Sequence, residues 1–106
     1  MLEKLRQIEN RYAELESKLA DSAYYSDPAV FTKLCREQRE LQPVVEAYRA
    51  YTACQAQIAQ AEALLGDPEL HEIARDEIEH GKIRCADLEK QLRVLLLPRD
   101  PNDDRN

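Results

Sequence analysis

Apolar residues recur along this chain at alternating spacings of three and four positions, and this spacing restricts the fold more than any other feature. An α-helix turns once every 3.6 residues, so residues spaced in this way lie in one stripe along one face. The 106-residue sequence contains two glycines, one phenylalanine and no tryptophan, which favours narrow helix contacts over a broad core. We therefore expect an all-α fold, an antiparallel helical hairpin or a coiled-coil-like bundle of three to four helices.

The amino-terminal half predicts two helices. A first stripe predicts a helix over about residues 2–20 and contains Leu2, Leu5, Ile8, Tyr12, Leu15 and Leu19. The segment from Asp21 to Asp27 breaks the period, and Asp27 followed by Pro28 is typical of a helix start. The second helix should bury Val30, Phe31, Leu34 and Leu41. Pro43 predicts a kink or a break, because its ring would strike the carbonyl group four residues earlier.

The carboxyl-terminal half predicts a hairpin of two antiparallel helices. The first stripe contains Val44, Tyr48, Tyr51, Cys54, Ile58, Ala61 and Leu65. Gly66 favours a helix end in the left-handed conformation, and Asp67 with Pro68 repeats the helix-start pattern, so residues 66–68 predict a tight turn. The second stripe has the strict alternation of a coiled coil and contains His71, Ala74, Ile78, Gly81, Cys85, Leu88, Leu92 and Leu95. Gly81 indicates either close approach of the partner helix, which we favour, or a bend.

Charge and cysteine usage exclude several classes of protein. The net charge is −6, and an acidic surface is repelled by nucleic acid, so we expect no direct nucleic-acid binding by this domain. No stretch reaches the roughly 20 apolar residues that a membrane helix needs. Cys35, Cys54 and Cys85 form no Cys-x-x-Cys pair. We expect a cytoplasmic protein with reduced thiols, in which Cys54 and Cys85 pack in the core.

No arrangement of residues indicates catalysis, a cofactor or a metal. His71 and His80 lie nine residues apart, which places them on opposite faces of a helix. Carboxylate pairs such as Glu72 with Asp76 lie on a solvated face, where nothing raises one pKa for acid–base work. The sequence has no glycine-rich phosphate loop and no Gly-x-Ser-x-Gly motif. We therefore expect no catalytic, cofactor-binding or metal-binding residues, and no enzyme.

Tyrosines and sorted charges are the remaining candidates for a partner surface. Tyr48 and Tyr51 lie on the apolar stripe and should be core, whereas Tyr24 and Tyr25, in the break, either contact a partner or cover the helix ends. Residues 66–80 hold six acidic side chains against one basic one, and residues 82–99 hold five basic against two acidic. The helix macrodipole favours this order, so we interpret it as support for one continuous helix rather than as a binding patch.

The last twelve residues resemble a segment of a known protein family. The segment LLLPRDPNDDRN, residues 95–106, resembles a signature segment of the bacterial peptide chain release factor 1 family. The segment LLGDPELHEIARDEI, residues 64–78, is similar to the hairpin turn and last helix of the family's amino-terminal domain, whereas the first 60 residues match only as helices. The resemblance implies that residues 1–97 are this amino-terminal domain and that residues 98–106 begin the linker to codon-recognition and Gly-Gly-Gln domains.

The family directs translation termination at UAA and UAG codons and promotes hydrolysis of peptidyl-tRNA. The resemblance implies that this domain contacts the ribosome near the stalk base and the GTPase-associated region, while the codon-reading and Gly-Gly-Gln motifs lie outside these 106 residues. The sibling release factor 2 has the same architecture and remains an alternative. A free-standing coiled-coil adaptor, which would dimerise through its apolar stripe, is a second alternative from another class.

Overall fold

Three α-helices and one 3₁₀ helix make up the described part of the chain. The computed structural model describes residues 1–98, with α1 over Leu2–Ala20, the 3₁₀ helix η1 over Ser22–Ser26, α2 over Pro28–Ala63 and α3 over His71–Leu95. Within these residues there is no strand, and the predicted all-α class is confirmed. The predicted linker over residues 98–106 lies, except for Pro98, outside the described residues.

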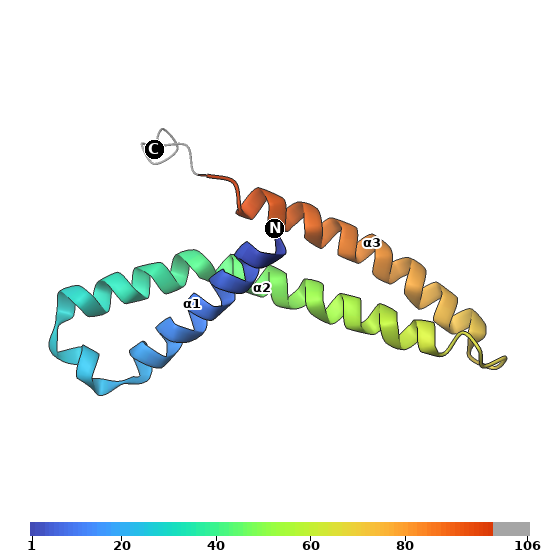
Figure 1. The fold of residues 1–106 in the computed structure, drawn as a ribbon, viewed down its shortest axis with the longest axis horizontal. Helices are drawn as coiled ribbons and strands as arrows, with labels where there is room; N and C mark the ends of the chain where they lie inside the picture. Colours follow the sequence, from blue (N-terminus) through green and yellow to red (C-terminus); the bar gives the residue numbers. More distant parts are fainter. Residues whose placement is uncertain (99–106) are drawn as a thin grey trace.

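The helices form two arms that meet in the middle of α2 (Figure 1). We call α1, η1 and the first half of α2 the α1 arm, and the second half of α2 with α3 the hairpin arm. The radius of gyration is 19.0 Å, whereas a compact domain of this length would have about 13 Å. The three helices share one cluster of buried side chains, which we call the central core, formed by Leu5, Val44, Ala47 and Leu92.

Local sequence explains where α1 ends and α2 begins. Asp21 accepts a hydrogen bond from the Ala23 amide at 3.0 Å and starts η1. Asp27 accepts from the Ala29 and Val30 amides at 3.1 and 3.3 Å, so the predicted cap at the start of α2 is confirmed. The tyrosines that we expected in a loop lie in η1, because the segment winds into a short 3₁₀ turn between these two caps.

Helix α2 is continuous through Pro43, so the alternative of a break is wrong. Proline removes one hydrogen bond and costs about 3 kcal/mol inside a helix. Three of the four residues after it, Val44, Val45 and Ala47, are buried, and this burial stabilises the helix across the proline. Figure 1 shows that α2 changes direction where it passes α1.

The turn between α2 and α3 is longer than predicted. Helix α2 ends at Ala63 and α3 starts at His71, not at Pro68. No glycine in the described residues has a positive φ, so the left-handed conformation expected at Gly66 is wrong. Bonds of the 3₁₀ type close the turn instead, from Asp67 N to Leu64 O and from Leu70 N to Asp67 O, both at 3.1 Å. The Asp67 side chain accepts from the Glu69 amide inside the turn rather than capping α3.

The apolar stripes lie largely where the sequence places them. All seven residues of the stripe from Val44 to Leu65, and all of those of α3 except His71, are buried or half-buried. The predicted burial of Leu2 and Val30 is wrong, because each lies in the first turn of its helix and is exposed, at 54% and 41%. A Cβ atom on Gly81 would lie 2.6 Å from Ile58 Cγ1, which confirms the predicted close approach of α2 and α3.

Candidate functional site

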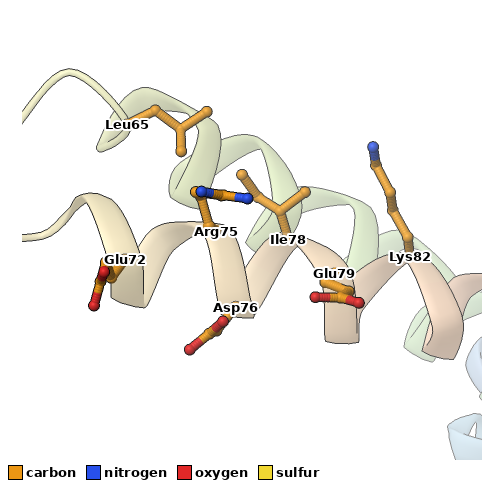
Figure 2. A pocket seen from close by; sticks show the side chains of 7 residues that line it. All are labelled: Leu65, Glu72, Arg75, Asp76, Ile78, Glu79 and Lys82. Atoms are coloured by element: carbon orange, nitrogen blue, oxygen red, sulfur yellow. The ribbon is translucent and has the colours of Figure 1, made fainter.

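The far end of the hairpin arm is the most acidic surface of the described residues. We call residues 64–82 the hairpin end. Glu72, Asp76 and Glu79 follow each other at helical spacing, and Figure 2 shows their carboxylates along one side of α3. Among residues 1–98, no ion pair involves a residue of the hairpin end, so its carboxylates face water. Such a surface favours contact with a basic partner.

Exposed apolar side chains accompany these acids. Leu64, Leu70 and Ile73 are 44%, 37% and 61% exposed and lie in or beside the turn. Single exposed apolar residues are common on protein surfaces, but several at one end of an elongated molecule are typical of a contact surface. The macrodipole accounts for the order of the charges along α3 but not for this exposure. The hairpin end therefore fits protein–protein contact better than a merely solvated helix.

An open depression beside the turn does not have the properties of a catalytic pocket. It has a volume of about 660 Å³ and its walls include Leu65, Arg75, Ile78 and the three carboxylates in Figure 2. Among residues 1–98 no polar or charged residue is buried, so nothing here excludes water around the pair Glu72 and Asp76. A site for acid–base chemistry is usually a concave pocket that encloses its substrate, and this open helix face does not enclose one.

The two histidines make local backbone contacts. His71 Nδ1 lies 2.8 Å from Leu65 O across the turn, and His80 Nδ1 lies 2.8 Å from Asp76 O one helical turn earlier. Both side chains are exposed. Within the described residues, no three histidine, cysteine, aspartate or glutamate side chains are grouped so that they could hold a metal ion.

Cys54 and Cys85 pack between α2 and α3, as predicted. The Cys54 thiol donates a hydrogen bond to Gly81 O at 3.2 Å. Burial, together with hydrogen bonding to Cys54, raises the pKa of Cys85 to about 11. A thiol that stays neutral is a weak nucleophile, so Cys85 is a packing residue rather than a reactive one, and the burial of Cys54 gives it a packing role as well. Cys35 is half-buried on α2, and none of the three cysteines forms a disulfide.

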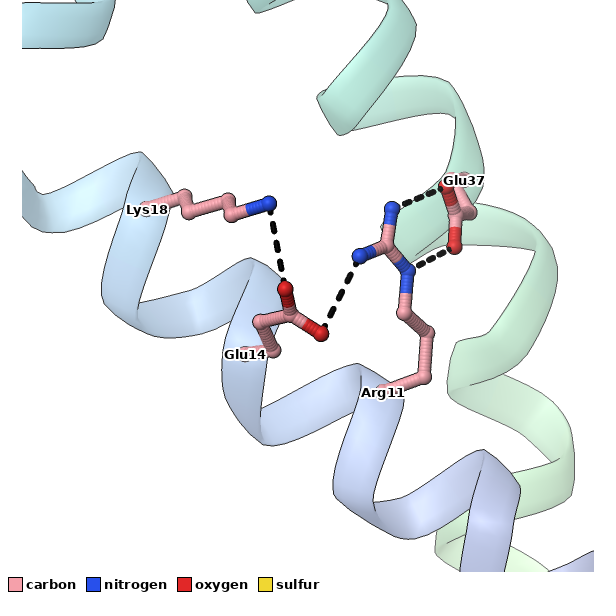
Figure 3. A network of polar contacts seen from close by, with 4 residues as sticks. All are labelled: Arg11, Glu14, Lys18 and Glu37. Atoms are coloured by element: carbon pink, nitrogen blue, oxygen red, sulfur yellow. Dashed lines mark hydrogen bonds and ion pairs between the residues drawn. The ribbon is translucent and has the colours of Figure 1, made fainter.

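A polar network joins α1 to α2 in the other arm, and the sequence did not reveal it (Figure 3). Arg11 donates two hydrogen bonds to Glu37, one of them from Nη2 at 2.9 Å, although the residues are 26 positions apart. Glu14 bridges Arg11 and Lys18 at 3.2 and 3.1 Å. The Arg11 guanidinium lowers the pKa of Glu37, and Lys18 followed by Arg11 lowers that of Glu14. Helix spacing signals only the pairs within α1.

The tyrosines divide as their positions predict. Tyr48 and Tyr51 are half-buried against the central core. Burial also raises the pKa of Tyr51. Tyr25 covers a helix end, because its hydroxyl donates to Leu19 O at 2.8 Å and its ring meets Phe31 edge-on at 5.3 Å. Tyr25 is nevertheless 53% exposed, so one side of its ring faces solvent.

None of the helices in residues 1–98 combines the length and apolar character that crossing a membrane requires.

A family model described as the PCRF domain matches residues 8–106. The chain belongs to this family.

Relatives of this PCRF domain are similar to it over its whole length. The chain is 45% identical over 106 residues to peptide chain release factor 1 of Geobacter sulfurreducens and 44% identical over 106 residues to that of Geobacter metallireducens. It is 39% identical over 109 residues to peptide chain release factor 1 of Clostridium botulinum. In each case all of this chain is covered but only 30% of the relative. No solved structure gives a significant match.

Proposed function

We propose that this PCRF domain is the amino-terminal domain of a type 1 peptide chain release factor. The observation that carries the proposal is the similarity, over the whole chain, to three release factors of that name. The parent protein would act in the cytoplasm in translation termination at UAA and UAG codons. Residues 1–97 form the helical domain in this proposal, and residues 98–106 begin the linker to the parts that read the codon and promote hydrolysis.

In this proposal the domain contributes contact with the ribosome rather than chemistry. The helix faces are open to water, and the described residues bury no carboxylate, histidine, lysine or arginine. The hairpin end is the surface best suited to the contact, because it combines unpaired carboxylates with exposed Leu64, Leu70 and Ile73. Its charge favours a basic protein over RNA, and we place it at the stalk base or the GTPase-associated region.

A domain exchange tests the proposal. Residues 1–97 replace the matching segment of release factor 1 from Geobacter sulfurreducens, to which the chain is 45% identical. Peptide release is then measured on ribosomes stalled at a UAA codon. We expect release close to that of the unaltered factor, because the domain supplies a contact surface and the reading and catalytic parts are unchanged. A chimera that folds but binds ribosomes no better than the factor lacking this segment would contradict the proposal.

The contact surface is tested by reversing charge in the same chimera. The triple variant Glu69→Lys, Glu72→Lys and Asp76→Lys changes three exposed acids of the hairpin end. We expect a higher concentration of factor to be needed for half-maximal release, with little change in the rate at saturation, because binding and not chemistry is altered. The matched control reverses three exposed acids elsewhere, Glu3, Glu16 and Glu40. An equal effect of both triple variants would contradict a role for the hairpin end.

A free-standing adaptor is less well supported. Such a protein should dimerise through its apolar stripes, but the stripes of α2 and α3 cover each other within one chain. Sedimentation equilibrium of the isolated domain should therefore give a monomer. A stable dimer would favour the adaptor.

A further inference from the structure

A second candidate surface lies at the corner where η1 joins α2, at the opposite end of the molecule from the hairpin turn (Figure 1). A depression of about 270 Å³ is lined there by Tyr25, Pro28, Phe31 and Thr32. A neighbouring depression is lined by Pro28, Ala29, Thr32, Lys33 and Arg36. Because the two depressions share Pro28 and Thr32, they form one continuous surface, which we call the corner surface.

Contacts with neighbouring residues of the protein hold the apolar side chains of the corner surface in place. The Tyr25 hydroxyl is bound to Leu19 O, and the Tyr25 ring packs edge-on against Phe31 with an interplanar angle of 89°. Pro28 has a fixed φ, and the cap at Asp27 fixes the first turn of α2. A depression with ordered walls loses little entropy when it binds, because its side chains are already in place.

The size of this depression selects the kind of ligand. Pockets for small molecules and cofactors have volumes of roughly 300–1,000 Å³ and enclose most of the ligand. At about 270 Å³ and with an open mouth, the pocket beside Tyr25 and Phe31 is smaller than that range. It therefore suits one large apolar side chain of a protein partner rather than a separate small molecule.

Two cations line the neighbouring depression of the corner surface. Lys33 and Arg36 are exposed, and neither takes part in an ion pair among residues 1–98. Of the acids nearest in sequence, Glu37 binds Arg11 and Asp27 accepts from two amides, whereas Glu40 is exposed one helical turn after Arg36. The residues that line the two depressions include these two cations and no acid, in contrast to the acidic hairpin end. The corner surface thus favours an acidic partner.

We propose that the corner surface binds an acidic protein segment, with one large apolar side chain in the pocket lined by Tyr25, Pro28, Phe31 and Thr32 and carboxylates beside Lys33 and Arg36. The inference goes beyond the proposed function and does not depend on it. RNA is the less favourable occupant, because two cations neutralise few phosphates and the chain as a whole carries a charge of −6. The two ends of the molecule would then bind partners of opposite charge.

A titration of the whole 106-residue chain with a defined probe tests the proposal. The probe is a synthetic peptide of about twelve residues, made of aspartate, glutamate and serine with two central leucines. Amide shifts of the ¹⁵N-labelled chain are recorded by nuclear magnetic resonance. We expect the shifted amides to cluster in residues 22–36, and the Kd to rise about tenfold when the leucines of the probe become serine. Shifts spread over α3, or no saturable shifts at all, would overturn the proposal.

Substitutions separate the charge contribution from the apolar one. Lys33→Glu with Arg36→Glu should raise the Kd at least tenfold. The control Arg84→Glu with Lys90→Glu makes the same change of net charge at exposed positions of α3 and should raise it less than twofold. Thr32→Trp, which fills the pocket from an exposed helix position, should also weaken binding tenfold or more. Melting curves identify any variant that fails to fold, and then the leucine-to-serine probe decides.

Three further outcomes of these titrations would overturn or change the proposal. Equal loss of binding in the corner variant and in the α3 control would mean that only net charge matters, and would overturn the site. Tighter binding of a uridine dodecamer than of the peptide at the same amides would replace the acidic segment with RNA. Unchanged affinity in a folded Thr32→Trp variant would remove the pocket from the proposal.

Discussion

The two arms share one helix but are held together in different ways. In the α1 arm the buried side chains are large, namely Leu5, Tyr12, Leu15 and Leu34. Charged contacts also cross between α1 and α2: Arg11 binds Glu37, Arg49 lies 3.7 Å from Glu9, and the Arg49 guanidinium lies 5.7 Å from the Tyr12 ring centre. In the hairpin arm the buried residues outside the central core are small, namely Cys54, Ala61 and Ala74, and the half-buried Gly81 lies against Ile58. In the described residues no ion pair links α2 to α3.

This difference shows how each helix pair obtains its register. A seven-residue connection joins α2 to α3, so chain connectivity already places their stripes opposite each other and small residues let the backbones approach. Helix α1 is joined to α2 by a connection of the same length, residues 21–27, so connectivity does not explain the difference between the two pairs. The difference lies in the side chains at each contact. In the α1 arm the contacts of Arg11 with Glu37 and of Arg49 with Glu9 add to the restriction, since each is made in only one relative position of the helices.

The largest effect should come from the central core, which both arms share. Leu92 and Leu15 are each 0% exposed, but only Leu92 belongs to the cluster where three helices meet. Either leucine replaced by alanine should cost about 2–5 kcal/mol of unfolding free energy. Leu92→Ala should increase amide hydrogen exchange in all three helices, whereas Leu15→Ala should increase it mainly in the α1 arm. Leu97→Ala, at a 66% exposed position, is the control and should change stability by less than about 0.5 kcal/mol.

The two outcomes of this pair of variants are distinct. Protected α1 amides in Leu92→Ala would mean that the arms unfold independently and that the central core does not couple them. Unprotected α3 amides in Leu15→Ala would mean that the arms form one cooperative unit, and the contrast between them would then apply to structure but not to stability.

Close packing at Gly81 predicts the next largest effect. A Cβ atom there would lie 2.6 Å from Ile58 Cγ1 and 3.2 Å from Ile58 Cδ1, so Gly81→Leu forces the helices apart. We expect a loss of about 1–3 kcal/mol in thermal or urea unfolding, although leucine has the better helix propensity. Gly66→Ala is the control, because nothing lies within 4 Å of its added Cβ. It should be neutral or stabilising, by up to about 1 kcal/mol.

The Ile58→Ala background sharpens this test. If the clash with Ile58 causes the loss, then Gly81→Leu should cost less in that background, because the new side chain fills the space that Ile58 leaves. An unchanged cost would mean that the backbone separation, and not Ile58, limits the size of residue 81.

The sequence predicted the buried residues of the hairpin arm better than those of the α1 arm, although it misplaced the turn of the hairpin arm. Periodicity identifies one stripe per helix, and in the hairpin arm each helix has one neighbour, so the stripes coincide with the buried residues. Near its middle α2 meets both α1 and α3. Val44, Val45 and Ala47 are therefore all buried, although they do not lie on a single stripe of the helix. Periodicity could not predict Val45 or Ala47. The same double burial explains why α2 continues through Pro43, which local rules treat as a break.

The candidate surfaces were less accessible to sequence reasoning than the fold. The acidic residues of the hairpin end were visible, but the exposure of Leu64 and Ile73 depends on where the turn lies, and the turn is longer than Gly66, Asp67 and Pro68 indicated. The corner surface could not be predicted, since it depends on Tyr25 meeting Phe31 across a 3₁₀ turn. The contact between Arg11 and Glu37 joins residues far apart in sequence, and no spacing rule signals it.

A smaller effect is expected from the ion pairs of the α1 arm, and it depends on pH. Arg11 lowers the pKa of Glu37 below its ordinary value of 4.5, so the folded state binds protons less readily than the unfolded one. The stabilisation is therefore present above pH 4.5 and is lost as pH falls through the folded pKa. Glu37→Gln should cost about 0.5–1 kcal/mol at pH 7, because the pair is partly exposed, and nothing at pH 2.

The measurement for Glu37→Gln is urea unfolding at both pH values, with Glu40→Gln as an exposed control on the same helix. Hydrogen exchange should report the change in α1 and not in α3. Equal destabilisation at pH 7 and pH 2 would mean that the effect is one of packing and not of charge.

The smallest effect is expected at the other end of the pH scale and in the other arm. Burial raises the pKa of Cys85 from 9.0 to about 11, so the folded state holds the thiol proton more tightly than the unfolded one. The stabilisation from the neutral thiol is complete below pH 9 and is lost as pH rises to about 11. Half exposure limits it to less than about 1 kcal/mol. Cys85→Ala should therefore flatten the decline of stability between pH 9 and 11, and Cys35→Ala should not. If the loss of protection from hydrogen exchange between pH 9 and 11 occurs in α1 amides instead of α3 amides, the loss of stability does not come from the hairpin arm. The contrast between the two arms would then fail.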